Sequence, residues 1–589
     1  MQRLHLLLLF SVFCFFSFTG IAQAQRLSEA IHLNQIGYYP DSPKKAVVTE
    51  GEPDYFYVLT PDFSDTLYTG QLGPIQEAPN AGQRVRIADF SDFSEPGTYI
   101  LWITKLGYSY QFTVAPRIYE DAAKASLKGF YHQRLSTPIP YEYGGKWARP
   151  AGHPDTLVVI HPSAATEERP AGSTISAPRG WYDAGDYNKY AVNSGITMGT
   201  MFSLYEDFPE YMAGFDINIP ETGNGLPDVL NELLWNLRWY LDMQDPHDGG
   251  VYHKLTAANF EGRLMPAEAR STRYVVQKSV TGTLNFAAVM AQAARIFGDY
   301  EELVPGLADS CLTAAEHAWE WAREHPDQLY NQNAMNQRYD PDILTGAYGD
   351  GNAADEFAWA AAELFATTGD RRYYDAVDMF PDDEASVPTW GNVQTLAYYT
   401  LARFGDDLPQ PAAQDIAKVN ALIIDLADRL KASASDSGYR TVMDGVGRYN
   451  WGSSSNAANQ GIALIQAYFL TGDREYLDAA HSNLDYLFGR NATGFSFLTG
   501  FGSKQVMDPH HRPSDARANV PPVPGLLAGG PNPGQQDECV YPSDLPAKSF
   551  LDDWCSYASN EIAINWNAPM VYLAAAIEAL QQEAGYAGE

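Results

Sequence analysis

The chain has 589 residues, which exceeds what one hydrophobic core normally supports, so we expect two or more domains. Asp and Glu number 73 against 39 Lys and Arg, giving a formal net charge of −34 that repels phosphate backbones and excludes nucleic acid as a partner. Aromatic residues make up 13% of the chain, which suits a large core and also a carbohydrate cleft, where rings stack on sugar faces.

The first 24 residues predict a secretory signal peptide. Arg3 and His5 precede an apolar run over 6–18, and Ala22 and Ala24 supply the small residues of a cleavage site. The run is too short for a comfortable bilayer span. We therefore expect cleavage near Ala24 and a secreted or periplasmic protein without a membrane anchor, with an uncleaved N-terminal anchor as the alternative.

Residues 29–115 predict a small antiparallel β-sandwich. Strand-like runs over 45–49, 55–59 and 98–102 alternate with turns rich in Pro, Gly and Asp. After Pro116 the pattern changes to helical periodicity, which continues to the C-terminus.

Residues 118–586 predict a helical domain built from repeated hairpins. Three expected helices end in Gly-Asp pairs, in which Gly suits the left-handed position after a helix and Asp suits the N-cap of the next one. These pairs are Gly298-Asp299, Gly369-Asp370 and Gly472-Asp473. Helical hairpins with long loops between them predict an α/α toroid, and an irregular α-domain is the alternative.

A turn with two aspartates is the first candidate for catalysis. Asp183 and Asp186 flank an Ala-Gly pair within an aromatic segment over 180–190. Carboxylates at this spacing can converge on one water, one positioning it and the other accepting its proton. Closely spaced Asp residues also suit calcium, but the ladder of ligands typical of an EF-hand is absent.

The second candidate is Glu561, which lies where an acidic loop meets an apolar helical run. An apolar setting and nearby carboxylates both raise the pKa of a carboxyl group, as a general acid near neutral pH requires. The alternative is a structural acidic residue in the first turn of a helix, stabilised by the helix dipole.

A third segment contains His510, His511 and Arg512 after Pro509. Such a cluster suits hydrogen bonding to sugar hydroxyls, while a metal pair at the two histidines and a loop-fixing salt bridge are alternatives. Adjacent histidines rarely converge on one metal, and no His or Cys partner lies at ligand spacing. No phosphate-binding loop, nucleophile elbow or zinc-protease motif is present.

Three cysteines remain after the predicted cleavage, namely Cys311, Cys539 and Cys555. An odd number excludes a fully paired framework. In an oxidising compartment Cys539 and Cys555 are the candidate disulfide, and a small buried hydrophobic role for Cys555 is the alternative.

Taken together, the segments 180–190, 496–512 and 550–568 resemble glycoside hydrolase family 9, the inverting cellulases with an (α/α)6 barrel. The run Asn-Gln-Ile-Gly-Tyr-Tyr-Pro over 34–40 is similar to the opening of the immunoglobulin-like domain that precedes many members, and 221–228 and 239–244 also resemble the family. The resemblance covers nearly the whole mature chain. It implies a mainly α protein, with an (α/α)6 catalytic barrel over 118–586 and an all-β immunoglobulin-like sandwich over 29–115.

The resemblance also implies residue roles. Asp186 is expected to be the general base, Asp183 to help position the water, and Glu561 to protonate the departing glycosidic oxygen. The remaining expected site residues are His510 and Arg512, which hold the sugar beside the scissile bond, Asp552, which supports the acid, and Tyr557 and Trp181, which contact the substrate.

No cofactor is expected for the chemistry itself, and a structural calcium ion is possible. Some family members carry calcium beside a Tyr/Ser-rich loop that ends in Asp-Glu. Asp355 and Glu356 supply the Asp-Glu pair here, but Gly351, Asn352 and Ala353 precede it in place of a Ser-rich loop.

The predicted function is therefore inverting, endoglucanase-like hydrolysis of β-1,4-glucosidic bonds in cellulose or a related β-glucan, by a monomer. One alternative is hydrolysis of another β-glycan, such as xyloglucan, mixed-linkage glucan or a glucosaminide. A second is a non-catalytic carbohydrate-binding protein, which would be expected to have lost Asp186 or Glu561; both are present.

Overall fold

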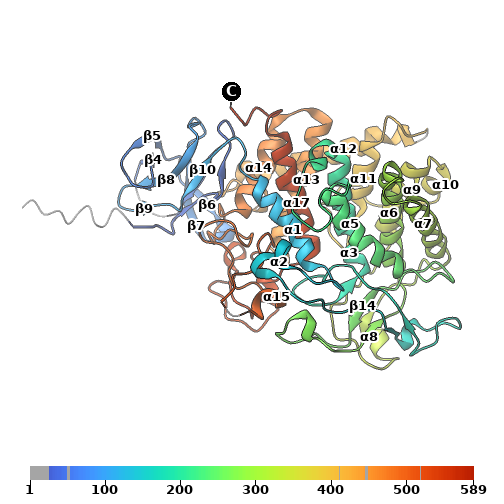
Figure 1. Ribbon diagram of the computed structural model, residues 1–589. Coiled ribbons are helices and arrows are strands. Elements are labelled where there is room, and N and C mark those ends of the chain that lie inside the picture. Colours follow the sequence, from blue (N-terminus) through green and yellow to red (C-terminus); the bar gives the residue numbers. More distant parts are fainter. Residues whose placement is uncertain (1–25, 50–52, 410–411, 445–448, 518, 589) are drawn as a thin grey trace, which may run out of the picture.

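The computed structural model describes residues 26–49, 53–409, 412–444, 449–517 and 519–588. The predicted signal peptide over 1–24, with its cleavage near Ala24, lies outside these residues. Figure 1 shows a small strand-rich unit packed against one end of a larger helical body. Within the described ranges, no helix has both the length and the apolar character needed to cross a membrane.

The strand-rich unit is a sandwich of two sheets. One has the strand order β1-β3-β7-β6 and the other β2-β10-β8-β4-β5, with β9 beside β8. Val48 of the first sheet packs in one core with Phe56 and Leu101 of the second. All pairs are antiparallel except β2 with β10. The strands are β1 (Ile31–His32), β2 (Gly37–Tyr38), β3 (Lys45–Val48), β4 (Tyr55–Leu59), β5 (Thr66–Gln71), β6 (Gln76–Ala78), β7 (Gln83–Asp89), β8 (Gly97–Ile103), β9 (Gly107–Tyr108) and β10 (Phe112–Val114).

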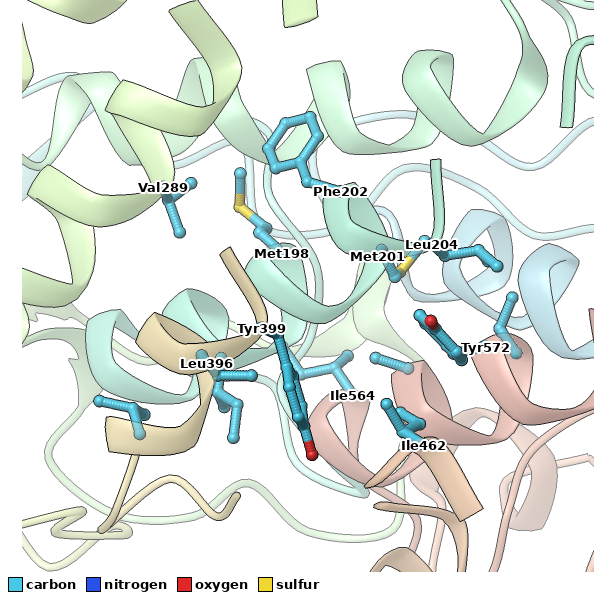
Figure 2. Packing of buried hydrophobic residues seen from close by; sticks show 14 of the residues in the cluster. Met198, Met201, Phe202, Leu204, Val289, Leu396, Tyr399, Ile462, Ile564 and Tyr572 are labelled. Carbon is cyan, nitrogen blue, oxygen red and sulfur yellow. The ribbon is translucent and has the colours of Figure 1, made fainter. Parts of the chain in front are cut away.

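The helical body has an inner and an outer layer of helices. Inner helices are buried all round: α6 buries every residue except Arg295, whereas its outer neighbour α7 buries one face only. Figure 2 shows side chains of inner helices packed together, among them Phe202, Val289 and Tyr572. The inner helices are α3 (Ala191–Asp207), α6 (Val280–Phe297), α9 (Ala354–Thr368), α11 (Gln394–Arg403), α13 (Ser453–Thr471) and α17 (Ile564–Leu580). The outer ones include α1 (Glu120–Gln133), α5 (Asp228–Asp242), α7 (Leu307–Glu324), α12 (Ala412–Asp436) and α14 (Arg474–Leu487).

Two of the three Gly-Asp pairs behave as predicted. Gly369 and Gly472 follow α9 and α13 with φ angles of 69° and 70°, and the next Asp side chain caps the following helix in both places. The prediction is wrong at Gly298, whose φ of −57° keeps the chain helical and leads into a short 3-10 turn. The mainly α fold with a leading β-sandwich is nevertheless confirmed.

A five-stranded sheet on the loops of the helical body was not predicted. Its order is β12-β11-β15-β14-β13, and β11 and β15 pair in parallel. The strands have only two to four residues, which is too short to produce a periodic sequence pattern. They are β11 (Val158–Ile160), β12 (Thr174–Ile175), β13 (Lys189–Tyr190), β14 (Lys254–Ala257) and β15 (Arg273–Val275).

The sandwich and the helical body share a polar, fully buried junction. Asn34 has no exposed surface, and its side-chain amide donates to Asp485 at 2.8 Å and to the Tyr119 hydroxyl at 3.0 Å. Arg490 donates to the other oxygen of Asp485 at 2.9 Å. Because buried polar groups are costly without partners, this network fixes how the two units pack.

Candidate active site

The turn that carries Asp183 and Asp186 is clamped against the start of α17. The Ile564 amide donates to the Asp183 carbonyl at 2.8 Å, and Ala184 pairs with Ala563 in a β-bridge. A side chain at Gly185 would lie 2.0 Å from the His510 carbonyl oxygen. Only glycine fits so close an approach, so the packing requires Gly185.

Asp186 has one engaged carboxylate oxygen and one bare one. Its Oδ2 accepts hydrogen bonds from the Asn188 amide at 2.5 Å and the Tyr190 hydroxyl at 3.1 Å. Its Oδ1 is buried and has no hydrogen-bond partner among the described residues. A carboxylate that is oriented through one oxygen and free at the other is suited to accept a proton from a bound water.

Asp183, in contrast, has both oxygens occupied. Asn193 donates to Oδ1 at 2.5 Å, and the Tyr348 hydroxyl donates to Oδ2 at 2.8 Å. Burial raises the pKa of Asp183 well above its usual value, and the charge of Asp186 adds to the effect. These contacts fix Asp183 as a polar neighbour of Asp186 and leave it no free oxygen to face a water.

Glu561 lies in extended conformation between α16 (Tyr557–Asn560) and α17, so the alternative that placed it in the first turn of a helix is wrong. Its carbonyl accepts from the Gly529 amide at 2.9 Å. Burial raises the pKa of Glu561 well above its usual value, with a further contribution from the charge of Asp186, while Arg512 opposes the shift. A carboxyl group that retains its proton in this way can serve as a general acid.

The three carboxyl groups line one cavity of about 690 Å³. Its remaining lining is rich in aromatic rings, and rings of this kind stack on the apolar faces of sugars. The aromatic lining residues are Tyr190, Phe260, Tyr348, Trp390, Trp451 and Trp566.

His510 and Tyr557 lie together beside Glu561. The His510 ring stacks on Trp554 at 4.1 Å and meets Tyr557 edge-on at 5.6 Å, and Tyr557 in turn lies 5.6 Å from Trp451. Burial lowers the pKa of His510 to about 4, so the ring is neutral at pH 7. Because Nδ1 lies 2.8 Å from the Trp554 carbonyl, which can only accept, Nε2 is left as an acceptor for a sugar hydroxyl.

Arg512 and Asp552 act on the loops around the cavity. Arg512 donates from Nη1 to the Gly185 carbonyl at 2.7 Å and from Nε to the Glu261 carbonyl at 2.8 Å, which holds the aspartate turn. Asp552 accepts from the amides of Met507 and Asp508 at 2.8 and 3.0 Å. Both side chains therefore contact the backbone of loops beside the cavity.

Trp181 lies in the hydrophobic core. It is 1% exposed, packs on Phe130 at 4.7 Å and donates from its indole to Glu232 at 3.4 Å. A ring enclosed by the core cannot stack on a sugar, so the expectation that Trp181 contacts the substrate is wrong.

The predicted Cys539–Cys555 disulfide is confirmed. It joins the loop before α16 to the residue that follows Trp554, whose ring supports His510. Cys311 is a free, buried thiol.

Asp355 and Glu356 lie in the first turn of α9 with unusual polar surroundings. The Asp355 carboxylate accepts from the Val393 amide at 2.8 Å, but both oxygens of Glu356 and one of Asp350 are buried without partners in the described structure. Burial raises the pKa of Glu356 well above its usual value, followed by the charges of Asp355 and Asp350. Carboxylate oxygens without hydrogen-bond partners suit a hard cation such as calcium. Among the described residues, however, no group of three His, Cys, Asp or Glu side chains is arranged to hold a metal ion.

Several residues that contact Asp183 and Asp186 were not predicted from the sequence. Tyr190, Asn188 and Tyr348 donate to the two aspartates, and only Asn188 and Tyr190 carried any signal, through their places just after the turn. Tyr348 comes from a loop far along the chain, and nothing in the sequence links it to Asp183.

Two family models match the chain. "Glycosyl hydrolase family 9" matches residues 119–574, and "Cellulase N-terminal ig-like domain" matches residues 26–107. The chain belongs to glycoside hydrolase family 9. This glycoside hydrolase therefore carries the carboxyl groups described above within the catalytic domain of that family.

Relatives of this family 9 hydrolase extend over almost its whole length. The "Xyloglucan-specific endo-beta-1,4-glucanase BoGH9A" of Bacteroides ovatus is 44% identical and "Endoglucanase D" of Acetivibrio thermocellus is 32% identical, and each match covers 94% of this chain, with 94% and 84% of those proteins covered. The solved structure "Bacteroides ovatus GH9" matches with a TM-score of 0.89 and 43% identity, over 94% of this chain and 100% of that one. The match to "GH family 9 endoglucanase J30" has a TM-score of 0.84 and 31% identity, over 92% and 99%.

Proposed function

We propose that this hydrolase cleaves β-1,4-glucosidic bonds within glucan chains by inversion, with Asp186 as general base and Glu561 as general acid. The observation that carries the proposal is the contrast between the two groups in one cavity. Asp186 has a bare, buried oxygen, and Glu561 has a carboxyl group whose pKa is raised by burial. One group is prepared to accept a proton and the other to donate one, as inversion requires.

In the proposed reaction a water beside Asp186 Oδ1 loses its proton to that oxygen while it attacks the anomeric carbon. Asn188 and Tyr190 stabilise Asp186 through its other oxygen, so Oδ1 stays directed at the water. Glu561 gives its proton to the departing glycosidic oxygen. His510 accepts a hydrogen bond from a sugar hydroxyl through Nε2, and the aromatic lining holds the rings.

The anomeric configuration of the first product tests this mechanism. Proton NMR of a fresh digest should show the α anomer first, with the β anomer growing only by mutarotation. A β anomer as the first product would mean a covalent intermediate, and would refute both role assignments.

For the substrate, the proposal comprises cellulose-type β-1,4-glucans, with xyloglucan as the second candidate. The support for xyloglucan is the relative at 44% identity, which is named for that polysaccharide. The match extends over 94% of this chain and 94% of that protein. Reducing-end release should be compared on carboxymethylcellulose, xyloglucan, mixed-linkage glucan and chitosan. A rate on chitosan exceeding all three glucans would refute the assignment to glucans.

We also propose that calcium binds beside Asp355 and Glu356. The support is the group of partnerless carboxylate oxygens at this place. Calcium should raise the melting temperature of chelator-treated protein, and Glu356→Gln should remove that increase. An equal increase in the variant would refute the site.

We further propose that the chain is exported, is cleaved near Ala24 and acts as a monomer. The signal-like residues 1–24 and the disulfide support export, since disulfides persist in oxidising compartments. N-terminal sequencing of protein recovered outside the cytoplasm tests the cleavage near Ala24. The molar mass measured by light scattering tests whether the protein is a monomer.

A further inference from the structure

Lys254 is a buried lysine opposite Tyr190, close enough to Asp186 to be affected by its charge. It is the first residue of β14 and has no exposed surface. Its ammonium donates to the Gln332 side-chain oxygen and the Gly346 carbonyl at 2.6 Å each, and to the Thr345 hydroxyl at 3.2 Å. A lysine ammonium has three donors, and all three are used here.

These bonds fix one wall of the catalytic cavity. Residues 344–348 line the cavity, and the last of them, Tyr348, donates to Asp183. His253, the residue before β14, holds the wall at a further point, because its Nε2 lies 2.8 Å from the Ala347 carbonyl. Lys254 and His253 therefore hold three consecutive residues of the wall, Thr345 to Ala347.

The wall needs such support because its last residue is strained. Tyr348 has a φ of 46°, in the left-handed region that side chains other than glycine rarely adopt. A conformation of this kind costs about 1–3 kcal/mol and persists only where the surroundings impose it. The bonds from Lys254 to Gly346 and from His253 to Ala347, the two residues before Tyr348, supply that constraint.

Lys254 also lies against the second donor to the aspartates. β14 pairs with β13 so that Lys254 is opposite Tyr190, and the ammonium is 5.6 Å from the centre of the Tyr190 ring. Tyr190 in turn donates to Asp186. The hydroxyls that orient Asp183 and Asp186 thus come from two elements, and Lys254 contacts both of them.

A structural role alone does not account for a charge at this position. Lys254 forms no ion pair with a carboxylate within the described structure, and burial lowers its pKa to about 7 while the charge of Asp186 opposes the decrease. Burying a cation without a directly bonded anion is costly. A buried lysine at this position is explained if it serves the carboxylates of the cavity.

We propose that Lys254 is a positioning residue for catalysis, which holds the 344–348 wall and Tyr190 so that their hydroxyls orient Asp183 and Asp186. The proposal rests on the proposed roles of these two aspartates. Lys254 does not line the cavity, so its effect should fall on turnover and leave sugar binding unaffected.

The test compares Lys254→Met with Lys44→Met. Lys44 is a matched control, because it is also fully buried and donates three hydrogen bonds, to carbonyls of the sandwich at 2.5 to 3.3 Å. On a soluble β-glucan, Lys254→Met should lower kcat about 10- to 100-fold, as expected for the loss of a charge-assisted orienting contact, and change KM less than threefold. Lys44→Met should lose thermal stability but keep kcat within twofold.

A kcat of Lys254→Met within twofold of wild type, or a rise in KM as large as the fall in kcat, would overturn the proposal. If Lys254→Met does not fold, Gln332→Met decides by the same criteria, since it removes one acceptor of Lys254 and a second bond from Gln332 to the Thr345 carbonyl. Its kcat should fall only about 3- to 10-fold at constant KM, because the ammonium keeps its bonds to Thr345 and Gly346. The anomer measurement on wild-type enzyme tests the role of Asp186 separately, so failure of either proposal can be recognised.

Discussion

Removing one hydroxyl from Tyr190 provides a sensitive test of how the base is oriented. Tyr190→Phe deletes the hydrogen bond to Asp186 Oδ2, which measures 3.1 Å, together with the bond between the hydroxyl and the Thr345 side chain, and leaves the Asn188 bond of 2.5 Å in place. The ring remains 2% exposed between the wall and β14, so no cavity larger than an oxygen atom is created.

The size of the effect follows from the charge on the acceptor. A hydrogen bond to a charged group contributes about 1.5–3 kcal/mol, and each 1.36 kcal/mol corresponds to a tenfold change in rate. If the whole contribution orients Asp186, kcat should fall about 10- to 150-fold. The remaining bond from Asn188 places the expected value near the lower end, at about tenfold.

The assay is kcat and KM on a soluble β-glucan, with Tyr39→Phe as the control. Tyr39 is fully buried, and its hydroxyl donates to the Glu578 carboxylate at 2.7 Å, so the same kind of bond is lost far from the cavity. Both variants should lose comparable stability, but only Tyr190→Phe should lose turnover. Equal kcat values for the two variants would refute the argument that Tyr190 orients the base.

Three further predictions concern the acid, the disulfide and a buried ion pair. Glu561→Gln should lower turnover of unactivated glucans about 10²- to 10⁴-fold and spare aryl glycosides with good leaving groups, because these need little protonation. Since the pKa of Glu561 is raised, wild-type kcat should stay high well above pH 4.5 and fall as pH rises through that pKa, and a pH–rate profile without such a decline would contradict the acid role. Replacing Cys539 and Cys555 by Ser should remove about 3 kcal/mol of stability for a sequence separation of 16, measured by denaturant unfolding, and an unchanged midpoint would contradict it. Glu232→Ala removes the 2.7 Å partner of buried Arg134 but leaves its pair with Glu221, so it should cost about 1.5–3 kcal/mol in the same assay, whereas less than 1 kcal/mol would mean that the pair is dispensable.

The sequence predicts the helical fold and the principal carboxyl groups because their signals are local. Helical periodicity and the Gly-Asp pairs are read within a few residues, and so is the Asp183-Ala-Gly-Asp186 turn. The Gly298 case shows the limit of such signals, since glycine permits a left-handed turn but does not require one.

The remaining features depend on contacts between distant segments. Tyr348 is one of 37 tyrosines, and only the folded loop brings its hydroxyl to Asp183. Lys254 is equally inconspicuous in a short strand. The prediction for Trp181 was wrong because a tryptophan beside the aspartate turn has the same sequence context whether its ring faces the cavity or the core.

The clamp between the aspartate turn and the start of α17 has a consequence for biosynthesis. The Asp183 carbonyl and Ala184 are held by Ile564 and Ala563, which are synthesised long after the turn itself. Until that segment has been made, the turn lacks its support and Glu561 is missing. A chain terminated before Glu561 should therefore be inert toward glucans.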